Sequence, residues 1–551
     1  MKRKPFLPLL LFVAALVALT SCGSKSGKTG LLVPEDAAIV FHINNSSLAS
    51  KLSWDEIKQT NWFKAASGHS KDSFAQKLLQ DPSASGIDTK ADFVVFLKKA
   101  TKNGYLVFEG SIKDATAFEN FNKQMHNSAT TVKEGDISSI ALDDDAALTW
   151  DKNHFAYVMG ISIPRMNMGG DMGEYGSNEK TSTDSLKLYG KSVLGLKKSA
   201  LLDNDSRFVD LIKDGKDMHM WINSDETYEN MFPMMEMAGN IAALVKGNVG
   251  ALSFNFDNGK ITMDSKSYYG KELSSILSKY KASAVSADVA GRIPSQNVIL
   301  ALAMNYPPEA IKEIIKVAGM EGFANMALLK AGISLDELIK ATKGEFLFSV
   351  SDIQMKEKAD TIDMGGGKPF IHSRTEPDAK VLFAASVNDK AAFEKMVTLL
   401  WDKMKEEAPA GSTPPVTYKV ENNWFALSNH GEHVDQFLAG NSPKSPIADR
   451  ISGHPIGFFL DVRQILQTIR TIAKDSAAQS IFGLSTETWE NIAAWGGEYS
   501  GNSMEFHAEI NMMDKKTNSL KQLNTYIDKI ATTFINKEKE RSADIEPVAP
   551  F

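Results

Sequence analysis

The sequence has a single cysteine among 551 residues, so the chain cannot form an internal disulfide. Positive charge is not in excess: 61 Lys and Arg residues stand against 68 Asp and Glu residues, which disfavours a general nucleic-acid-binding protein. Beyond the N-terminal segment no run of 18 apolar residues occurs, so we expect the remainder to be soluble. The Gly-x-Ser-x-Gly motif of many hydrolases is absent, and we identify no catalytic residue and no cofactor motif.

The N-terminus has the features of a secretory signal. Residues 2–4 are basic, and the apolar stretch from Phe6 to Leu19 is shorter than a membrane span of about 20 residues. The following Leu19-Thr20-Ser21-Cys22 resembles the bacterial lipobox, in which small residues allow the peptidase to approach and the Cys thiolate accepts a diacylglyceryl group. We therefore predict a signal peptide over residues 1–21 and lipidation of Cys22. A plain secretory signal and an uncleaved anchor stay open as alternatives.

The segment after Cys22 predicts a tether. Residues 22–30 are polar and rich in Gly and Ser, which gives a flexible chain. Cleavage removes three basic residues and no acidic ones, leaving a net charge of −10 that keeps the body off an anionic bilayer. Several acyl chains, such as palmitate, anchor a protein stably. Gly23 resembles the sorting signal of outer-membrane lipoproteins, so we expect an outer-membrane position facing the periplasm, with the cell surface as the alternative.

The body predicts a tandem duplication, with one half over residues 31–288, a second over 289–540 and a frayed tail over 541–551. The clearest repeat pairs Ser111–Glu119 with Ser386–Glu394, where Asp114 and Asp389 stand at the expected helix N-caps. Further pairs recur in the same order. They are Val33-Pro34 with Ile293-Pro294, Asn153–Ala156 with Asn423–Ala426, Lys216–Asn223 with Pro455–Asp461, and two hairpins that turn at Asp257-Asn258-Gly259 and Gly501-Asn502.

The pattern of elements predicts an α+β fold. Apolar residues alternate by twos in strand-like runs joined by tight turns, and the helical segments carry apolar residues at helical spacing. We therefore expect antiparallel or mixed sheets packed with helices in both halves. Three polar or Gly-rich segments, 166–180, 364–377 and 408–415, are expected to be loops.

Taken together, several motifs resemble one family. The lipobox, Val33-Pro34, the helix opening at Ser111–Glu119, and Phe208–Lys213 followed by Met218–Asn223 are similar to the bacterial lipoproteins called domain of unknown function 4836. The resemblance covers essentially the whole mature chain. It implies an exported lipoprotein and supplies no activity, so it assigns no catalytic residue.

His430, Glu432 and His433 form the densest group of metal-ligand types, because imidazole and carboxylate can hold zinc. Two His residues at i, i+3 around a Gly are not the helical His-Glu-x-x-His motif, so we favour a solvated loop and predict no metal site. Asp143-Asp144-Asp145 lacks the spacing of a calcium loop and is expected to be a hairpin turn.

Two further segments have alternative interpretations. Gly365–Lys368 resembles a phosphate loop only in part, because Pro369 stands where a Ser or Thr would hold magnesium. The methionines at 231, 234, 235 and 237 are expected to fill a core, with a partner-binding groove and a Cu(I) site as alternatives.

The leading hypothesis is a non-enzymatic, membrane-tethered binding or scaffolding protein of the cell envelope. The lipid would attach it to the membrane, and its partner would be an envelope protein, a glycan or a lipid. The alternative is an envelope hydrolase with a carboxylate/His site, which predicts a pocket with convergent ionisable groups.

Overall fold

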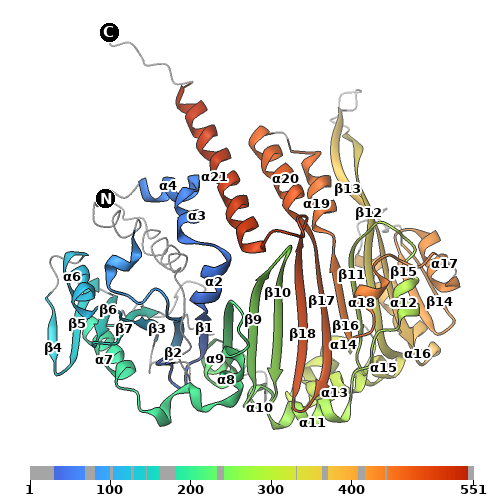
Figure 1. Cartoon of the computed structure of the whole chain (residues 1–551). Coiled ribbons are helices and arrows are strands. Elements are labelled where there is room, and N and C mark those ends of the chain that lie inside the picture. Colours follow the sequence, from blue (N-terminus) through green and yellow to red (C-terminus); the bar gives the residue numbers. More distant parts are fainter. Residues whose placement is uncertain are drawn as a thin grey trace. The chain divides into compact units, whose positions relative to one another are not determined.

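The computed structural model describes most of the chain beyond residue 29 (Figure 1). The described ranges are 30–68, 81–99, 103–125, 130–143, 145–161, 181–231, 241–329, 332–362, 370–407, 416–440, 443–473 and 475–543. They form two compact units. The first comprises the described residues within Met1–Met237, Val245–Gly270 and Thr517–Thr532, and the second those within Ala238–Leu244, Lys271–Lys516 and Thr533–Phe551.

The first unit contains an antiparallel sheet in the order β4–β5–β6–β7–β3–β2–β1–β8–β9–β10. Its strands are β1 (Ile39–Ile43), β2 (Phe93–Lys99), β3 (Gly104–Ser111), β4 (Val132–Glu134), β5 (Ile137–Asp143), β6 (Ala146–Trp150), β7 (His154–Ile161), β8 (Met218–Asn223), β9 (Val249–Asp257) and β10 (Lys260–Tyr268).

The second unit contains another antiparallel sheet, in the order β14–β15–β13–β12–β11–β16–β17–β18. Its strands are β11 (Val298–Asn305), β12 (Thr342–Ile362), β13 (Phe370–Val387), β14 (Thr417–Glu421), β15 (Trp424–Ser428), β16 (Ile456–Leu460), β17 (Trp489–Ser500) and β18 (Ser503–Met512). The α+β class is thus confirmed, and both sheets are antiparallel rather than mixed.

Helices connect these strands. Those of the first unit are α2 (Asn45–Lys51), α3 (Trp54–Gln59), α4 (Asn61–Gly68), α6 (Ala115–Met125), α7 (Thr183–Leu194), α8 (Ser206–Ile212) and α9 (Ser224–Met231). Those of the second are α11 (Lys271–Lys279), α12 (Ala287–Gly291), α13 (Pro308–Val317), α14 (Glu321–Leu329), α15 (Leu335–Ala341), α16 (Lys390–Glu407), α17 (Gly431–Ala439), α18 (Ala448–Ile451), α19 (Val462–Arg470) and α20 (Ser476–Thr488). Two more, α10 (Ile241–Val245) and α21 (Ser519–Ala543), contribute residues to both units.

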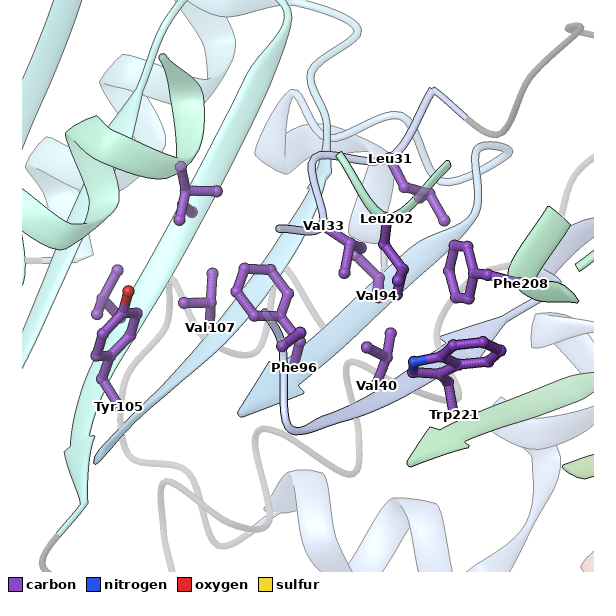
Figure 2. Close-up of a cluster of buried hydrophobic side chains, with 14 of the residues drawn as sticks. Leu31, Val33, Val40, Val94, Phe96, Tyr105, Val107, Leu202, Phe208 and Trp221 are labelled. Atoms are coloured by element: carbon purple, nitrogen blue, oxygen red, sulfur yellow. The ribbon is translucent and has the colours of Figure 1, made fainter. Parts of the chain in front are cut away.

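The core of the first unit is built from a row of side chains on one face of its sheet (Figure 2). Trp221, Val40, Phe96 and Val107 are cross-strand neighbours on β8, β1, β2 and β3, and all are buried. Because side chains alternate along a strand, this row places one apolar layer on a single face. Phe208 of α8 covers the row, with its ring 5.6 Å from that of Trp221 in an edge-on contact.

Local signals in the sequence placed several elements correctly. Asp114 Oδ1 accepts the backbone N–H groups of Thr116 and Ala117, and Asp389 Oδ1 accepts that of Ala392, so both are N-caps as predicted. Both predicted hairpins form, as β9–β10 and β17–β18, and Gly259 and Gly501 adopt the positive φ that their turns require.

Two expectations about irregular segments are wrong. Residues 370–377, expected to be loop, belong to strand β13, which pairs with β12 as far as Phe370↔Ile362. Polar side chains suit both faces of this hairpin, so composition alone suggested a loop. The C-terminal helix α21 also continues to Ala543, past residue 541 where the frayed tail was expected to begin. Segments 166–180 and 408–415 lie outside the described residues.

Candidate functional site

A pocket of about 530 Å³ opens on one face of the β17–β18 ribbon in the second unit, a size typical of ligand sites. Its floor consists of Trp495 and two successive cross-strand pairs on that face, Ala493↔Glu509 and Asn491↔Asn511. His507 is the cross-strand partner of Trp495. The methyl group of Ala493 is the smallest side chain in the row. We infer that the hollow exists because Ala493 stands between larger neighbours.

Helix α18 and the turn after it form the wall of the pocket through Asp449, Arg450 and His454. The helix lies close to the sheet because residue 457 on β16 is glycine. A Cβ at Gly457 would stand 2.3 Å from the carbonyl oxygen of Ile451, too near for any other residue. Gly457 therefore fixes the distance between α18 and the strands that carry Trp495.

The acidic side chains at the pocket already have partners. Glu490 forms an ion pair with Lys515, and Glu509 Oε1 lies 3.3 Å from His507 Nε2. Asp449 pairs with Lys444 at 2.6 Å. Since each carboxylate is engaged, the pocket does not present a free acid–base pair to a ligand.

Arg450 is the exception among the charged groups. Its guanidinium stacks on the ring of Phe459, 5.3 Å from the centroid. Among the described residues it has neither an ion pair nor a side-chain hydrogen bond, although it lines the pocket and is exposed. A guanidinium in this state offers planar donors to an incoming anion.

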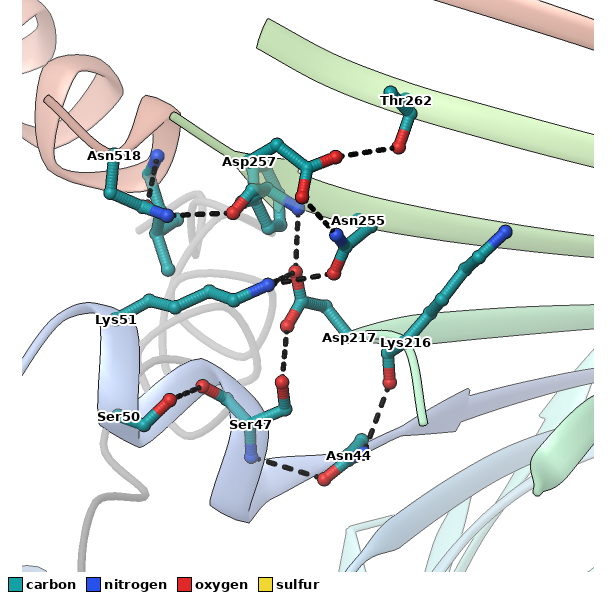
Figure 3. Close-up of polar contacts among 12 residues, drawn as sticks. Asn44, Ser47, Ser50, Lys51, Lys216, Asp217, Asn255, Asp257, Thr262 and Asn518 are labelled. Carbon is teal, nitrogen blue, oxygen red and sulfur yellow. Dashed lines mark hydrogen bonds and ion pairs between the residues drawn. The ribbon is translucent and has the colours of Figure 1, made fainter. Parts of the chain in front are cut away.

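A second polar cluster, the Asp217 network, lies inside the first unit (Figure 3). Asp217 is fully buried and accepts hydrogen bonds from Ser47 Oγ at 2.7 Å, Lys51 Nζ at 2.6 Å and the backbone N–H of Phe256 at 2.6 Å. Lys51 also donates to Asn255 Oδ1. The network joins α2 to the residue before β8 and to β9, and the carboxylate of Asp217 is already fully engaged, so we assign it a structural role.

Two buried histidines meet across the paired strands β1 and β8. His42 Nδ1 and His219 Nδ1 are 2.9 Å apart, and His219 Nε2 lies 2.7 Å from Asp214 Oδ1. His42 Nε2 is 3.2 Å from Asp92. Burial lowers the pKa of His42, against the opposing effect of Asp92. One hydrogen bond therefore links the two rings, and both imidazoles are closed to solvent, whereas Asp92 and Asp214 are partly exposed.

A third pair, Glu109 and His154, should make the stability of the fold depend on pH. The hydrogen bond that His154 Nδ1 donates to Glu109 raises the pKa of His154, and burial raises the pKa of Glu109. Both shifts mean that the folded state binds protons more tightly than the unfolded chain. The contribution of His154 is therefore complete below pH 6.5, its unfolded value, and is lost as pH rises through its raised folded value; that of Glu109 is complete below pH 4.5 and is lost in the same direction.

We expect Glu109→Gln to remove this pH dependence, because the amide cannot titrate while it keeps the shape of the side chain. The urea midpoints of the natural protein and the variant, measured from pH 6 to pH 9, test it. The difference in urea midpoint between the natural protein and the variant should become smaller as pH rises. Parallel profiles would show that the pair does not titrate as described.

The structure corrects the interpretation of the 430–433 segment. It is not a solvated loop: α17 begins at Gly431, and His433 is buried. The rings of His430 and His433 are 6.1 Å apart, and burial lowers the pKa of His433. The described residues contain no group of three or more His, Cys, Asp or Glu side chains suited to hold a metal ion, so His430, Glu432 and His433 do not form one.

Asp143 ends β5 and Asp145 directly precedes β6, which begins at Ala146, so these two residues lie at the hairpin between the strands as expected. The other candidates fall outside the described residues. They are Cys22, Asp144, Gly365–Lys368 and Met234, Met235 and Met237. No helix in the described ranges is both long enough and apolar enough to cross a membrane.

Sequence reasoning missed the pocket residues. Arg450 and Trp495 are far apart in the chain, and no spacing motif connects them. The one available signal was the repeat itself, since Lys216–Asn223 and Pro455–Asp461 were already paired. Position 219 is His in the first copy, and the matching position 457 is Gly.

The fold and the site thus define an α+β protein with a mixed polar and aromatic pocket. A family model described as "Domain of unknown function (DUF4836)" matches residues 30–398, more than half of the chain, so the chain belongs to this family. No curated protein matches it.

Among solved structures, two crystal forms of TP0453 are similar to parts of the chain. Crystal form III has 11% identity and a TM-score of 0.25, and the match covers 48% of this chain and 90% of that one. Crystal form IV has 10% identity and a TM-score of 0.24, with 46% and 86% covered. Likenesses at these TM-scores carry no argument about this protein.

Proposed function

We propose that the chain is an exported lipoprotein, anchored through Cys22, that binds a ligand and does not catalyse a reaction. The pocket beside Trp495 carries this proposal: its carboxylates are already paired, and its arginine has no ion-pair partner among the described residues. The lipobox and the polar tether support attachment to the outer membrane with the body facing the periplasm.

The proposal includes a duplicated body, which the strand orders support. If β1 corresponds to β11, the order β6–β7–β3–β2–β1–β8–β9–β10 matches β14–β15–β13–β12–β11–β16–β17–β18 strand by strand. In this correspondence β4 and β5 are additions to the first copy. Unrelated sheets of this size would not share one order by chance.

Backbone hydrogen bonds at matching positions give independent support. The N–H of Asn44 donates to Asp217 O at 2.9 Å, and that of Asn305 donates to Pro455 O at 2.8 Å. Two further bonds recur at corresponding places in the two strand orders. They pair Asn223 N–Ala38 O with Asp461 N–Ile299 O, and Ile112 N–Asn153 O with Val387 N–Asn423 O. Such agreement is expected of copies of one module.

An envelope hydrolase is the alternative, because Glu490, Glu509 and His454 all line the pocket. Hydrolysis of a glycosidic bond needs two carboxylates free to act on it. The ion pair of Glu490 with Lys515 and the contact of Glu509 with His507 favour ligand binding over hydrolysis. Turnover of an envelope substrate by the purified protein, abolished by Glu509→Gln, would establish the hydrolase.

We expect Cys22→Ser to abolish membrane attachment, because a hydroxyl cannot replace the thiolate that takes the lipid. In bacterial cells the variant should leave the detergent phase on Triton X-114 partitioning, and its mass should lack the acyl groups. Ser21→Ala, which keeps a small residue at the lipobox, serves as the matched control and should partition like the natural protein. A Cys22→Ser protein that still partitions into detergent would overturn the anchor.

A further inference from the structure

We propose that the pocket beside Trp495 binds a saccharide that carries an acidic group, such as a uronic acid; this rests on the binding function proposed above. The sugar ring would lie on the indole of Trp495, and its carboxylate would face Arg450. The inference draws on the aromatic floor, the unused hydrogen-bonding groups and the comparison of Arg450 with its counterpart in the first copy.

The indole of Trp495 is a suitable platform for a sugar ring. It is half-buried, and its ring lies 4.4 Å from that of His507, which supports it from the neighbouring strand. Gly457 of β16 is its cross-strand partner, the backbone of Ile451 takes the place of a side chain there, and the ring of His454 lies 6.3 Å from the indole. Trp495 therefore offers to the pocket the part of its ring that these groups leave exposed, and the apolar C–H face of a pyranose packs well against such an aromatic surface.

Hydroxyl groups of a sugar need both donors and acceptors, and the pocket retains both. Asn511 Nδ2 donates to Asn491 Oδ1 at 3.1 Å. Within the described ranges the amide oxygen of Asn511 and the indole N–H of Trp495 have no hydrogen-bond partner, although both residues line the pocket. Amides that offer a donor and an acceptor at adjacent positions are well suited to neighbouring hydroxyls.

We infer an acidic group on the ligand from a comparison of the two copies. In the first, Arg207 stacks over Trp221 at 5.6 Å, and in the second Arg450 stacks over Phe459 at 5.3 Å, which is the position that matches Trp221. Arg207 is neutralised by Asp205, to which Nε donates at 3.0 and 3.2 Å and Nη2 donates at 2.6 Å. Arg450 has no such carboxylate in the described part of the chain, so a ligand anion can take the place of Asp205.

A cationic ligand fits the pocket less well, although Trp495 could stack on one. Glu490, Glu509 and Asp449 each have a Lys or His partner, whereas the guanidinium of Arg450 has none in the described ranges. Binding a cation would require breaking one of these pairs and would bring a second positive charge near Arg450. An anion can instead meet the guanidinium of Arg450 without displacing an existing partner.

Isothermal titration of the full mature lipoprotein in detergent tests the proposal. The probes are a trigalacturonate, a hyaluronan tetrasaccharide and 3′-sialyllactose, with lactose as the neutral comparison. We expect at least one acidic probe to bind more tightly than lactose. Trp495→Ala should weaken that binding by roughly tenfold or more, and Trp495→Phe, which keeps an aromatic ring, should weaken it less.

Two arginine variants separate charge recognition from a general effect. Arg450→Gln should weaken binding of the acidic probe by roughly tenfold and leave lactose nearly unchanged. Arg207→Gln, the matched change in the first copy, should leave binding of both unchanged. A thermal melt of each variant shows whether it is folded.

Lack of binding by all three acidic probes, or an equal loss in Arg450→Gln and Arg207→Gln, would overturn the inference. Either result would not affect the proposed lipid anchor, provided that the Cys22→Ser variant moves out of the detergent phase as expected. Conversely, an anchor that fails its own test does not affect the titration, so the two proposals fail separately.

Discussion

Asp217→Ala should lower the free energy of unfolding by about 3–5 kcal/mol, the usual cost of removing one partner from a buried ion pair. The change leaves Lys51 Nζ, whose side chain is only 19% exposed, without its carboxylate. It also removes the acceptor of the Phe256 N–H and of the Ser47 hydroxyl. Unpaired donors in a buried position lose their hydration without compensation, which is why the effect is large.

The measurement is the urea midpoint and its slope at pH 7, compared with Asp36→Ala as the control. Asp36 also pairs with a lysine, Lys98 at 2.8 Å, but its side chain is 47% exposed. Exposed pairs contribute about 0–1 kcal/mol, so the control should unfold almost as the natural protein does. Similar losses in the two variants would contradict a special role for the Asp217 network.

Gly86→Ala should destabilise the first unit by about 3 kcal/mol or more, for two reasons. Gly86 has φ +77°, where a Cβ costs about 1–2 kcal/mol. The added carbon would also stand 2.4 Å from the Asp114 carbonyl oxygen and 2.4 Å from the Phe118 N. These are backbone atoms at the start of α6, so relief requires the helix to move away from the buried ring of Phe118.

Gly215→Ala is the matched control, because the backbone is nearly the same and the surroundings are not. Gly215 has φ +78°, and nothing lies within 4 Å of the position its Cβ would occupy. Only the conformational term remains, so a loss of about 1 kcal/mol is expected. The difference between the two midpoints in chemical denaturation measures the steric part. Equal losses would show that α6 adjusts freely around Gly86.

Features that depend on neighbouring residues could be predicted from the sequence. Asp114 and Asp389 cap helices because a carboxylate reaches N–H groups two or three residues ahead, whatever the rest of the chain does. The hairpin turn at Gly259 likewise depends on a few residues. The segment 430–433 shows the limit of local patterns. Its polar residues suggested a loop, but burial of His433 and Val434 makes it the first turn of α17.

The pocket could not be predicted in this way. It requires Trp495 of β17 to pair with Gly457 of the adjacent strand β16. The register of two strands that are distant in the sequence is not encoded in any short segment. The prediction of a loop over residues 370–377 was wrong for the same reason, because pairing with β12 makes this segment a strand. Propensity is a weak guide where hydrogen bonds to another strand determine the conformation.

The sequence by itself determined the acidic balance, the single cysteine after a signal-like segment, the order of matching motifs and the local caps and turns. Each of these depends on residue type or on contacts within a few positions. The tertiary structure alone decided the two strand orders, the close approach of α18 over Gly457, and the isolation of Arg450 beside Trp495. Those features depend on backbone pairing between segments far apart in the chain, where folding sets the neighbours of a side chain.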